Sequence, residues 1–599
     1  MQRRNFLERL GAGALALLGT SGWTFTEQEA SSLLLETEQF DDKGGWKLDS
    51  QFYDELGFAY LLAHGLGRPV ENARTTATFP EAGQYHLWVR TKDWVPGNWE
   101  APGRFKVRVD GQPVETVFGT EPGWGWQAAG PIEVPSRNVS VELEDLTGFD
   151  GRCDALYFSK DPNDEPPNEE EALKVWRRRQ LGLTDPPQEQ REFDVVVAGG
   201  GLAGCAAALA AHLQGREVAL IQDRPVLGGN ASSEVRTHTL GLKGRREDIL
   251  SQIDTPHYDN GSPKAKQAEK KRHENMNAAE NVHQFLGHSV HTVHTDGKQI
   301  QSVDALEFES GITRRFSAPI FIDCTGDGWL GYWAGADYRY GRESRHEFDE
   351  GWDRHGELWS PEEPDNRVMG SSVLWRSLER DEPVQFPDVP WAMPVAKNHK
   401  ATSGEWYWEY SANDVHQIDD AEHIRDHMLR AIYGSFANAK KEPKNARRDL
   451  EWVSYLIGKR ESRRLMGDYI YTMHDALECR DFPDTVVTEE RDVDVHYQRK
   501  RRGHPADFLA EAMFRNPKEE YYHVPFRSLY SKDIDNLMMA GRCFSCSHIG
   551  LGGPRVMRTC GQMGVAVGFA AHLCLKHDTS PRGVRQERIG ELRELCGYT

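Results

Sequence analysis

The stretch that decides the fold is Phe193-Asp-Val-Val-Val-Ala-Gly-Gly-Gly-Leu-Ala-Gly204, an apolar strand that turns through glycines into an alanine-rich helix. Gly199 allows the tight turn, Gly201 lets a pyrophosphate approach the backbone, and Gly204 permits close packing of the helix on the strand. A second apolar strand at 217–221 follows at the spacing of a βαβ unit. This pattern predicts a Rossmann-like domain that binds a dinucleotide.

The position that usually carries a ribose-binding carboxylate falls on Gln222, with Asp223 directly after it. The acid is displaced by one residue. A glutamine side chain can still donate and accept hydrogen bonds to a ribose diol, so we expect both residues at the cofactor.

Three further segments distinguish FAD from NAD. Leu227-Gly-Gly-Asn-Ala-Ser232 follows the second strand, Phe321-Ile-Asp-Cys-Thr-Gly-Asp327 reads as a strand ending in Thr-Gly-Asp, and 536–548 contains Gly541-Arg542 before a helix of small residues. Together with blocks at 458–464 and 521–527, they resemble the FAD-dependent oxidoreductase family, which has the glutathione-reductase type of FAD fold. The resemblance covers roughly 190–345 and 400–599.

The resemblance implies FAD as cofactor and a set of cofactor-binding positions. These are Gly199, Gly201, Gly204, Gln222, Asp223, Gly228, Gly229, Ser232, Thr325, Gly326, Asp327, Gly541 and Arg542. Only one dinucleotide fingerprint is present, so a second domain for NADPH is not expected. Oxygen, a quinone and a protein all stay open as the electron acceptor.

The fold class expected is an α/β FAD-binding Rossmann-like domain with an inserted α+β substrate domain, preceded by an all-β sandwich. Alternating strands such as 84–90, 104–110 and 139–144 predict the sandwich. The expected boundaries are an export signal at 1–30, the sandwich at 31–160, a linker at 161–190, FAD-binding segments at 191–345 and 501–599, and the substrate region at 346–500.

The net charge and the N-terminal sequence limit the possible partners and the cellular location of the protein. The 599 residues carry 72 Lys and Arg against 93 Asp and Glu, a net charge of −21, which disfavours nucleic-acid binding. The short basic clusters Lys270-Lys-Arg272 and 499–502 are interpreted as solvated surface, with an arginine group near the substrate cavity as the second interpretation. Arg3, Arg4, Phe6 and Leu7 precede an apolar run that is too short to span a bilayer, a pattern typical of twin-arginine export to the periplasm or outside. An N-terminal amphipathic helix that stays attached is the alternative, and no membrane span is expected.

Tryptophans are frequent in the expected sandwich. Two interpretations are weighed equally: stacking on a carbohydrate, or packing in the core and between domains. The residues concerned are Trp88, Trp94, Trp99, Trp124 and Trp126.

Cysteines and histidines offer two further hypotheses, both of which we rank below packing or surface roles. Cys543 and Cys546 form a CxxC that could shuttle electrons, although packing is the favoured role. Four histidines between 283 and 294 lack a matching carboxylate pattern, so no metal site is predicted.

Oxidation of an alcohol or amine by a flavin needs a base near the reacting carbon and a polar grip on the substrate. His548, in a glycine-rich loop after Gly541-Arg542, is the first candidate base, and His523 is the alternative. Arg555, at the start of a helix, and Arg463 are candidates for clamping a substrate, with interdomain salt bridges as the competing role.

The leading hypothesis is an exported FAD-dependent oxidoreductase that dehydrogenates a carbohydrate or polyol. Two alternatives stay open: a carbohydrate-binding surface protein whose flavin domain is idle, and a lyase or hydrolase that uses a transient keto intermediate without net oxidation.

Overall fold

The computed structural model describes residues 31–235, 239–259, 261–404, 408–497, 508 and 511–598. The expected export signal at 1–30 and the basic cluster at 499–502 lie outside these residues. No helix in these ranges is long and apolar enough to cross a membrane.

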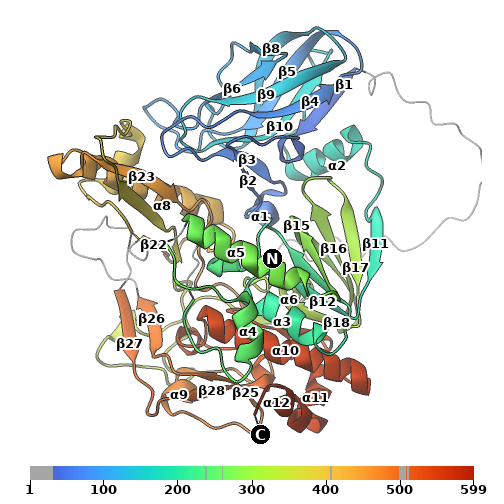
Figure 1. The fold of residues 1–599 in the computed structure, drawn as a ribbon, viewed down its shortest axis with the longest axis vertical. Coiled ribbons are helices and arrows are strands. Elements are labelled where there is room, and N and C mark those ends of the chain that lie inside the picture. Colours follow the sequence, from blue (N-terminus) through green and yellow to red (C-terminus); the bar gives the residue numbers. More distant parts are fainter. Residues whose placement is uncertain are drawn as a thin grey trace, which may run out of the picture.

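A five-stranded parallel sheet lies at the centre of the molecule (Figure 1). Four of its short strands are mostly apolar and fully buried, as expected of a parallel sheet covered by helices, whereas one edge strand is only partly buried. In spatial order they are β14 (Val282–Leu286), β13 (Val218–Gln222), β12 (Val195–Ala198), β18 (Ile320–Asp323) and β29 (Leu537–Met539). The sheet therefore joins the glycine-turn segment to a strand more than 300 residues later in the chain.

Helix α3 (Leu202–His212) follows the glycine turn and packs tightly on α10 (Met557–His577). A Cβ at Gly564 would lie 2.0 Å from the carbonyl oxygen of Ala203, so only glycine allows this approach. The small residues of both helices bring the C-terminal segment against the first βαβ unit, as the sequence predicts.

Smaller elements surround this core. A four-stranded sheet lies on one side of it, and short helices and hairpins lie around it (Figure 1). The sheet consists of β11 (Glu189–Glu192), β17 (Thr313–Ser317), β16 (Gln299–Glu307) and β15 (His288–Asp296); the others are α4 (Glu247–Ile253), α5 (Pro263–Asn277), α6 (Trp329–Trp333), α9 (Met473–Leu477), α11 (Pro581–Glu587), α12 (Ile589–Leu595), β25 (Thr485–Glu489) with β28 (Tyr522–Pro525), and β26 (Val493–Tyr497) with β27 (Glu511–Arg515).

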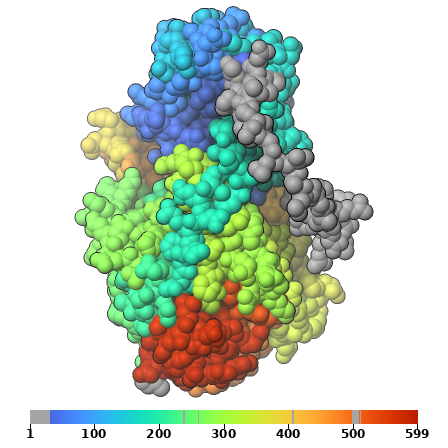
Figure 2. Space-filling view, turned by 90° about the vertical axis from the view of Figure 1, so that its right-hand side faces the viewer, coloured from blue at the N-terminus to red at the C-terminus, as the bar shows by residue number. Residues whose placement is uncertain are grey.

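The N-terminal domain contains two antiparallel sheets that share one hydrophobic core. It forms one end of the elongated molecule, and the C-terminal helices form the other (Figure 2). The first sheet contains β1 (Ser32–Glu36), β2 (Lys47–Asp49), β3 (Tyr60–Ala63), β5 (Gly83–Thr91), β8 (Gly125–Val134) and β10 (Gly151–Ser159); the second contains β4 (Ala73–Thr78), β6 (Phe105–Val109), β7 (Gln112–Pro113) and β9 (Asn138–Asp145). Helix α1 (Tyr53–Leu56) projects from this domain toward the central sheet (Figure 1).

The insert between β18 and β25 supplies the long helix α8 (Ala421–Lys440) and several short strand pairs, among them β21 (Trp375–Glu379) with β23 (Arg448–Val453). A buried ion-pair network joins α8 to the N-terminal domain. Arg152 binds Glu422 and Asp426 at 2.6 and 2.5 Å, and Arg425 binds Asp49 at 2.6 Å. Removing one partner of such a network would leave a buried charge uncompensated, so the two parts are firmly coupled.

The tryptophans of the N-terminal domain are largely enclosed. Trp94 packs edge-on against Trp391 of the insert, and Trp124 donates a hydrogen bond to Glu422 at 3.2 Å. Trp88 and Trp126 belong to a cluster with Trp176 of α2 (Glu170–Gln180). Two of the rings thus hold domains together, and two pack on the connecting helix.

Candidate functional site

The glycine turn has the geometry that the sequence predicts. Gly199 adopts a φ of +99°, which disfavours any side chain, and a Cβ there would collide with the carbonyl of Cys324 at 2.3 Å. Gly204 packs against the carbonyl of Gly199. At Gly201, by contrast, a Cβ would meet only the Cα of Gly229, at 3.9 Å. Open space therefore lies before the N-terminus of α3, where the helix dipole and free N–H groups favour an anion.

The structure gives Gln222 a different role from the one expected. Its side-chain oxygen accepts a hydrogen bond from the Gly200 N–H at 2.5 Å, and its nitrogen donates to the carbonyl of Val226 at 3.4 Å. The side chain is only 3% exposed and braces the glycine turn. Asp223, one residue later, remains partly exposed at the end of β13 and lines the cavity described below.

A second glycine loop lies opposite the first. The Gly228 N–H donates to the carbonyl of Gly200 at 2.7 Å, and Gly228 and Gly229 both line the cavity. Arg272 secures this loop, donating to the carbonyls of Ile253, Leu227 and Ala231. It is 1% exposed, so the expectation of a solvated basic cluster is wrong at this residue. Ser232 is fully buried and is not among the described residues that line the cavity.

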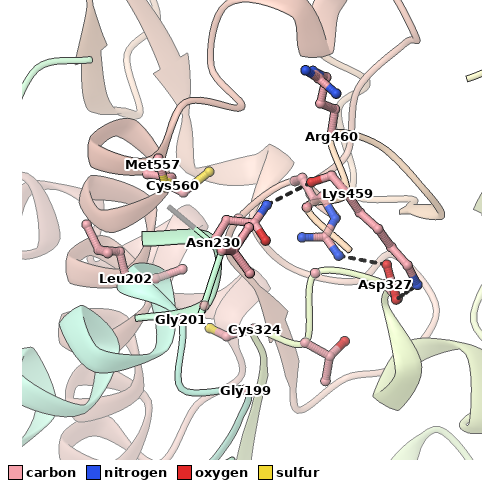
Figure 3. Close-up of a pocket in the computed structure, with 18 of the residues that line it drawn as sticks. Gly199, Gly201, Leu202, Asn230, Cys324, Asp327, Lys459, Arg460, Met557 and Cys560 are labelled. Carbon is pink, nitrogen blue, oxygen red and sulfur yellow. Dashed lines mark hydrogen bonds and ion pairs between the residues drawn. The ribbon is translucent and has the colours of Figure 1, made fainter. Parts of the chain in front are cut away.

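Asp327 is the centre of an ionic cluster that brings three segments together (Figure 3). Its carboxylate accepts hydrogen bonds from Lys459 at 2.7 Å, from Arg542 at 2.8 Å and from Ser462 at 2.7 Å. Burial alone would raise the pKa of Asp327, but Lys459 and Arg542 hold that pKa far below its ordinary value. The cluster fixes Thr325, Gly326, Gly541 and Arg542, all expected at the cofactor, along one wall.

These elements enclose one cavity of about 720 Å³, a size typical of cofactor and ligand sites. Most of the thirteen positions expected at the cofactor line this cavity. They are Gly199, Gly201, Gln222, Asp223, Gly228, Gly229, Thr325, Gly326, Asp327, Gly541 and Arg542. Open space at Gly201 and the facing glycine loop fit a pyrophosphate, and the cavity extends from it in two directions. We call the part beside Asp223 and β15 the adenosine end.

The opposite part contains charged side chains, and we call it the charged end. His496, on β26, lines it with Nδ1 2.7 Å from Glu409 and Nε2 3.4 Å from Asp494. Burial would raise the pKa of Glu409, but Arg460 and His496 outweigh it and lower that pKa. An ionised Glu409 can only accept a hydrogen bond, so Nδ1 of His496 carries the proton. Nε2, which lies 3.4 Å from Asp494, is the ring nitrogen that does not bind Glu409.

Three arginines share the charged end with His496. Arg555 lies 3.3 Å from Asp494, Arg491 lies 2.6 Å from the same carboxylate, and Arg460 lies 3.4 Å from Glu409. Burial lowers the pKa of Arg555, so its charge is poorly solvated. Burial raises the pKa of Asp494, but His496 and Arg555 reverse this, and the net shift is well downward. The group can therefore bind several oxygen atoms of a polar substrate.

The family model of FAD dependent oxidoreductases matches residues 194–595. The chain belongs to this family. The protein is an FAD-dependent oxidoreductase, and the cavity residues described above could hold FAD.

Solved structures with similar folds have low identity to this FAD-dependent oxidoreductase. A geranylgeranyl bacteriochlorophyll reductase-like protein from Thermoplasma acidophilum is 12% identical over 68% of this chain and 84% of its own, with a TM-score of 0.33. A myxobacterial chondrochloren halogenase is 14% identical over 67% and 79%, with a TM-score of 0.30. A family 35 carbohydrate binding module from Clostridium thermocellum is 16% identical over 21% and 97%, with a TM-score of 0.18. No curated protein matched the chain.

The residues expected to act in catalysis are mostly not at the cavity of this oxidoreductase. His548 is 3% exposed, with Nδ1 2.8 Å from Glu461, and is not among the described lining residues. His523, on β28, lies with its Nδ1 3.1 Å from the hydroxyl of Thr488, and it is also not among the described residues that line the cavity. Arg463 stacks on Trp329 and Tyr332, with its guanidinium carbon 4.2 and 3.9 Å from the ring centres. Only Arg555 lies where the sequence places it.

His496 was not singled out because its local signal is weak. It lies on a short hairpin strand inside the region expected to shape the substrate pocket, and its partner Glu409 is 87 residues earlier. The alternation Asp494-Val495-His496 does place two polar groups on one face of a strand, which was the available hint.

The cysteines and the histidines of β14 and β15 do not form a redox or metal centre among the described residues. Cys543 and Cys546 are free and buried, and burial raises the pKa of both thiols well above the usual value. Both side chains are packed in the hydrophobic core, which is consistent with the packing role that the sequence favours. His283 and His294 pair with carboxylates, and the one candidate group for a metal in the described ranges is Glu36, Glu38 and Asp154 in the N-terminal domain. Arg177 already binds Glu36 and Asp154.

Proposed function

We propose that this enzyme dehydrogenates a hydroxylated, carbohydrate-like small molecule at the charged end of the cavity. The observation that carries the proposal is the position of His496. This residue lines the charged end of the cavity and is held between Glu409 and Asp494. The residues of the adenosine end would hold the adenosine of FAD, and those of the charged end would face its reactive ring.

When bound, FAD accepts two electrons and a proton as a hydride. The chain must supply the base, and His496 Nε2 is placed to take the hydroxyl proton as the neighbouring C–H bond breaks. The substrate carbon becomes a carbonyl, and the imidazolium that forms is stabilised by Glu409 and Asp494. Bound FAD would take up the two electrons that the substrate loses.

The charge at this end supports a substrate with many hydroxyl groups. Arg460, Arg491 and Arg555 offer donors, and Asp494 offers acceptors, within one small volume. An apolar substrate would cover these groups without satisfying them, which costs free energy. A sugar or polyol can satisfy both kinds of group.

The test is anaerobic mixing of the holoenzyme with a panel of sugars, polyols and amines while the flavin absorption band is recorded. Bleaching by a sugar or polyol supports the proposal. Bleaching by amines alone, or by no member of the panel in enzyme that dithionite reduces normally, would refute it.

We further propose that residues 1–30 direct export by the twin-arginine route, a proposal that rests on Arg3 and Arg4. Replacing both arginines by lysine should leave the enzyme in the cytoplasmic fraction. Unchanged export of the lysine variant would contradict it.

A further inference from the structure

The N-terminal domain contributes directly to the cavity wall. Gln51, Phe52 and Asp54, in and just before helix α1, line the same cavity as Asp223 and Asn230. No motif of the flavin fold includes these residues, because they precede the glycine turn by about 150 positions. Their location is a product of domain packing alone.

Three hydrogen bonds hold this segment against both sides of the cavity. Ser50 donates to the carbonyl of Asp223 at 2.9 Å, which places the segment at the end of β13. Gln51 donates to the carbonyl of Tyr455 at 2.9 Å and accepts from the N–H of Ile457 at 3.0 Å. The segment is thus bound to the central sheet on one side and to the insert on the other.

Asp54 is exposed and lines the cavity. Its carboxylate makes no hydrogen bond or ion pair with any residue in the described ranges. Asp223 is also nearly free, since its closest cationic contact is Arg224 at 3.8 Å. Two carboxylates with spare acceptors therefore face the adenosine end, where Gln222 is already committed to the glycine turn.

We propose that Asp54, supplied by the N-terminal domain, binds the adenosine ribose of FAD together with Asp223. A vicinal diol offers two donors, and a pair of carboxylates offers matching acceptors. The pair takes over the task of the acid that is missing at position 222. It follows that FAD binding and docking of the N-terminal domain stabilise each other.

Burial and the nearby Asp223 raise the pKa of Asp54 to about 8. A protonated Asp54 can donate a hydrogen bond to one ribose hydroxyl, and Asp223 can accept a hydrogen bond from the other. The two acids can therefore share this end of the cavity without full mutual repulsion.

The test compares full-length apo-protein carrying Asp54→Asn with wild type and with Glu115→Gln, an exposed acid of the same domain. FAD affinity is measured by flavin fluorescence, and ADP, 2′-deoxy-ADP and FMN are measured as competitors. We expect Asp54→Asn to weaken FAD roughly 10-fold, equivalent to about 1.4 kcal/mol. It should also reduce the preference for ADP over 2′-deoxy-ADP and leave FMN unchanged, while Glu115→Gln matches wild type.

Two results would overturn the inference. One is unchanged FAD affinity with the ADP preference intact. The other is parallel weakening of FAD and FMN, which would indicate general damage to the cavity. No substrate enters these measurements, so the outcome is independent of whether the enzyme oxidises a sugar.

Discussion

The two ends of the cavity are built by different means. The adenosine end depends on backbone geometry, because the glycines at 199 and 201 face the glycines at 228 and 229. The N-terminus of α3 adds a positive electrostatic field there. The charged end depends on side chains from separate segments, with His496 held by Glu409 and Asp494. Backbone geometry serves a ligand common to a whole family, whereas side-chain chemistry can be adapted to one substrate.

The largest expected effect is at the charged end. His496→Asn removes the base but keeps a polar side chain, so flavin reduction by substrate should slow roughly 10²–10⁴-fold. Stopped-flow absorbance with a sugar or polyol from the panel measures this rate. His523→Asn is the matched control and should reduce at the wild-type rate. A His496→Asn enzyme with undiminished reduction would assign the base elsewhere.

The adenosine end should respond in binding. Gly201→Val places methyl groups in the open space before α3 while meeting little protein, so the fold should persist and the Kd for FAD should rise roughly 100-fold. Gly590→Ala, on a helix where a Cβ meets nothing within 4 Å, is the control. Equilibrium titration of apo-protein measures both. Tight binding by Gly201→Val would show that the pyrophosphate lies elsewhere.

A smaller effect should separate positioning from catalysis at the charged end. Glu409→Gln keeps a hydrogen-bond acceptor for Nδ1 of His496 but removes the charge that stabilises the imidazolium. The reduction rate should fall roughly 10-fold, and the limb of its pH profile that reports the base should move to lower pH by about one unit. A rate loss with no movement of this limb would mean that Glu409 has a purely structural role.

The smallest effect distinguishes the two ends by their response to pH. In the folded apo-protein the pKa of Asp54 is raised from its ordinary value of 3.8 to about 8. Between these two pH values the unfolded chain releases a proton that the folded protein keeps. Asp54 therefore lowers the free energy of unfolding as pH rises through this range. Asp494 has a lowered pKa in the folded protein, so its carboxylate raises the free energy of unfolding above its ordinary pKa. This contribution is lost when the pH falls and the carboxylate is protonated.

Thermal unfolding of apo-protein at about pH 5 and about pH 8 measures this contrast. Asp54→Asn should gain stability relative to wild type at the higher pH, and Asp494→Asn should lose stability at both. An Asp54→Asn variant that tracks wild type at both values would show that water in the cavity keeps this carboxylate ionised.

The part of the site that could be read from the sequence is the part whose chemistry is local. Gly199, Gly201 and Gly204 lie within six residues, and each answers a steric demand of one turn, so their roles were predictable. Thr325–Asp327 and Gly541–Arg542 were placed by resemblance, and the structure puts them on the same wall. Gln222 was misread because its partner is the turn itself.

The catalytic expectations were less successful for a physical reason. His548 was chosen for its glycine-rich surroundings, but those glycines allow the loop to pack inward, and His548 is buried beside Glu461. Whether a histidine faces a cavity or a core depends on the packing of elements far apart in the chain. No spacing within one segment reports this.

The sequence by itself determined the βαβ unit, the glycine turn and the FAD-binding class, because backbone conformation and strand–helix periodicity are set by neighbouring residues. Only the tertiary structure decided that His496 meets Glu409 across 87 positions and that Asp54 of the N-terminal domain lines the same cavity as Asp223. These encounters arise from burial of apolar surface and buried ion pairs between domains, which are properties of the whole chain.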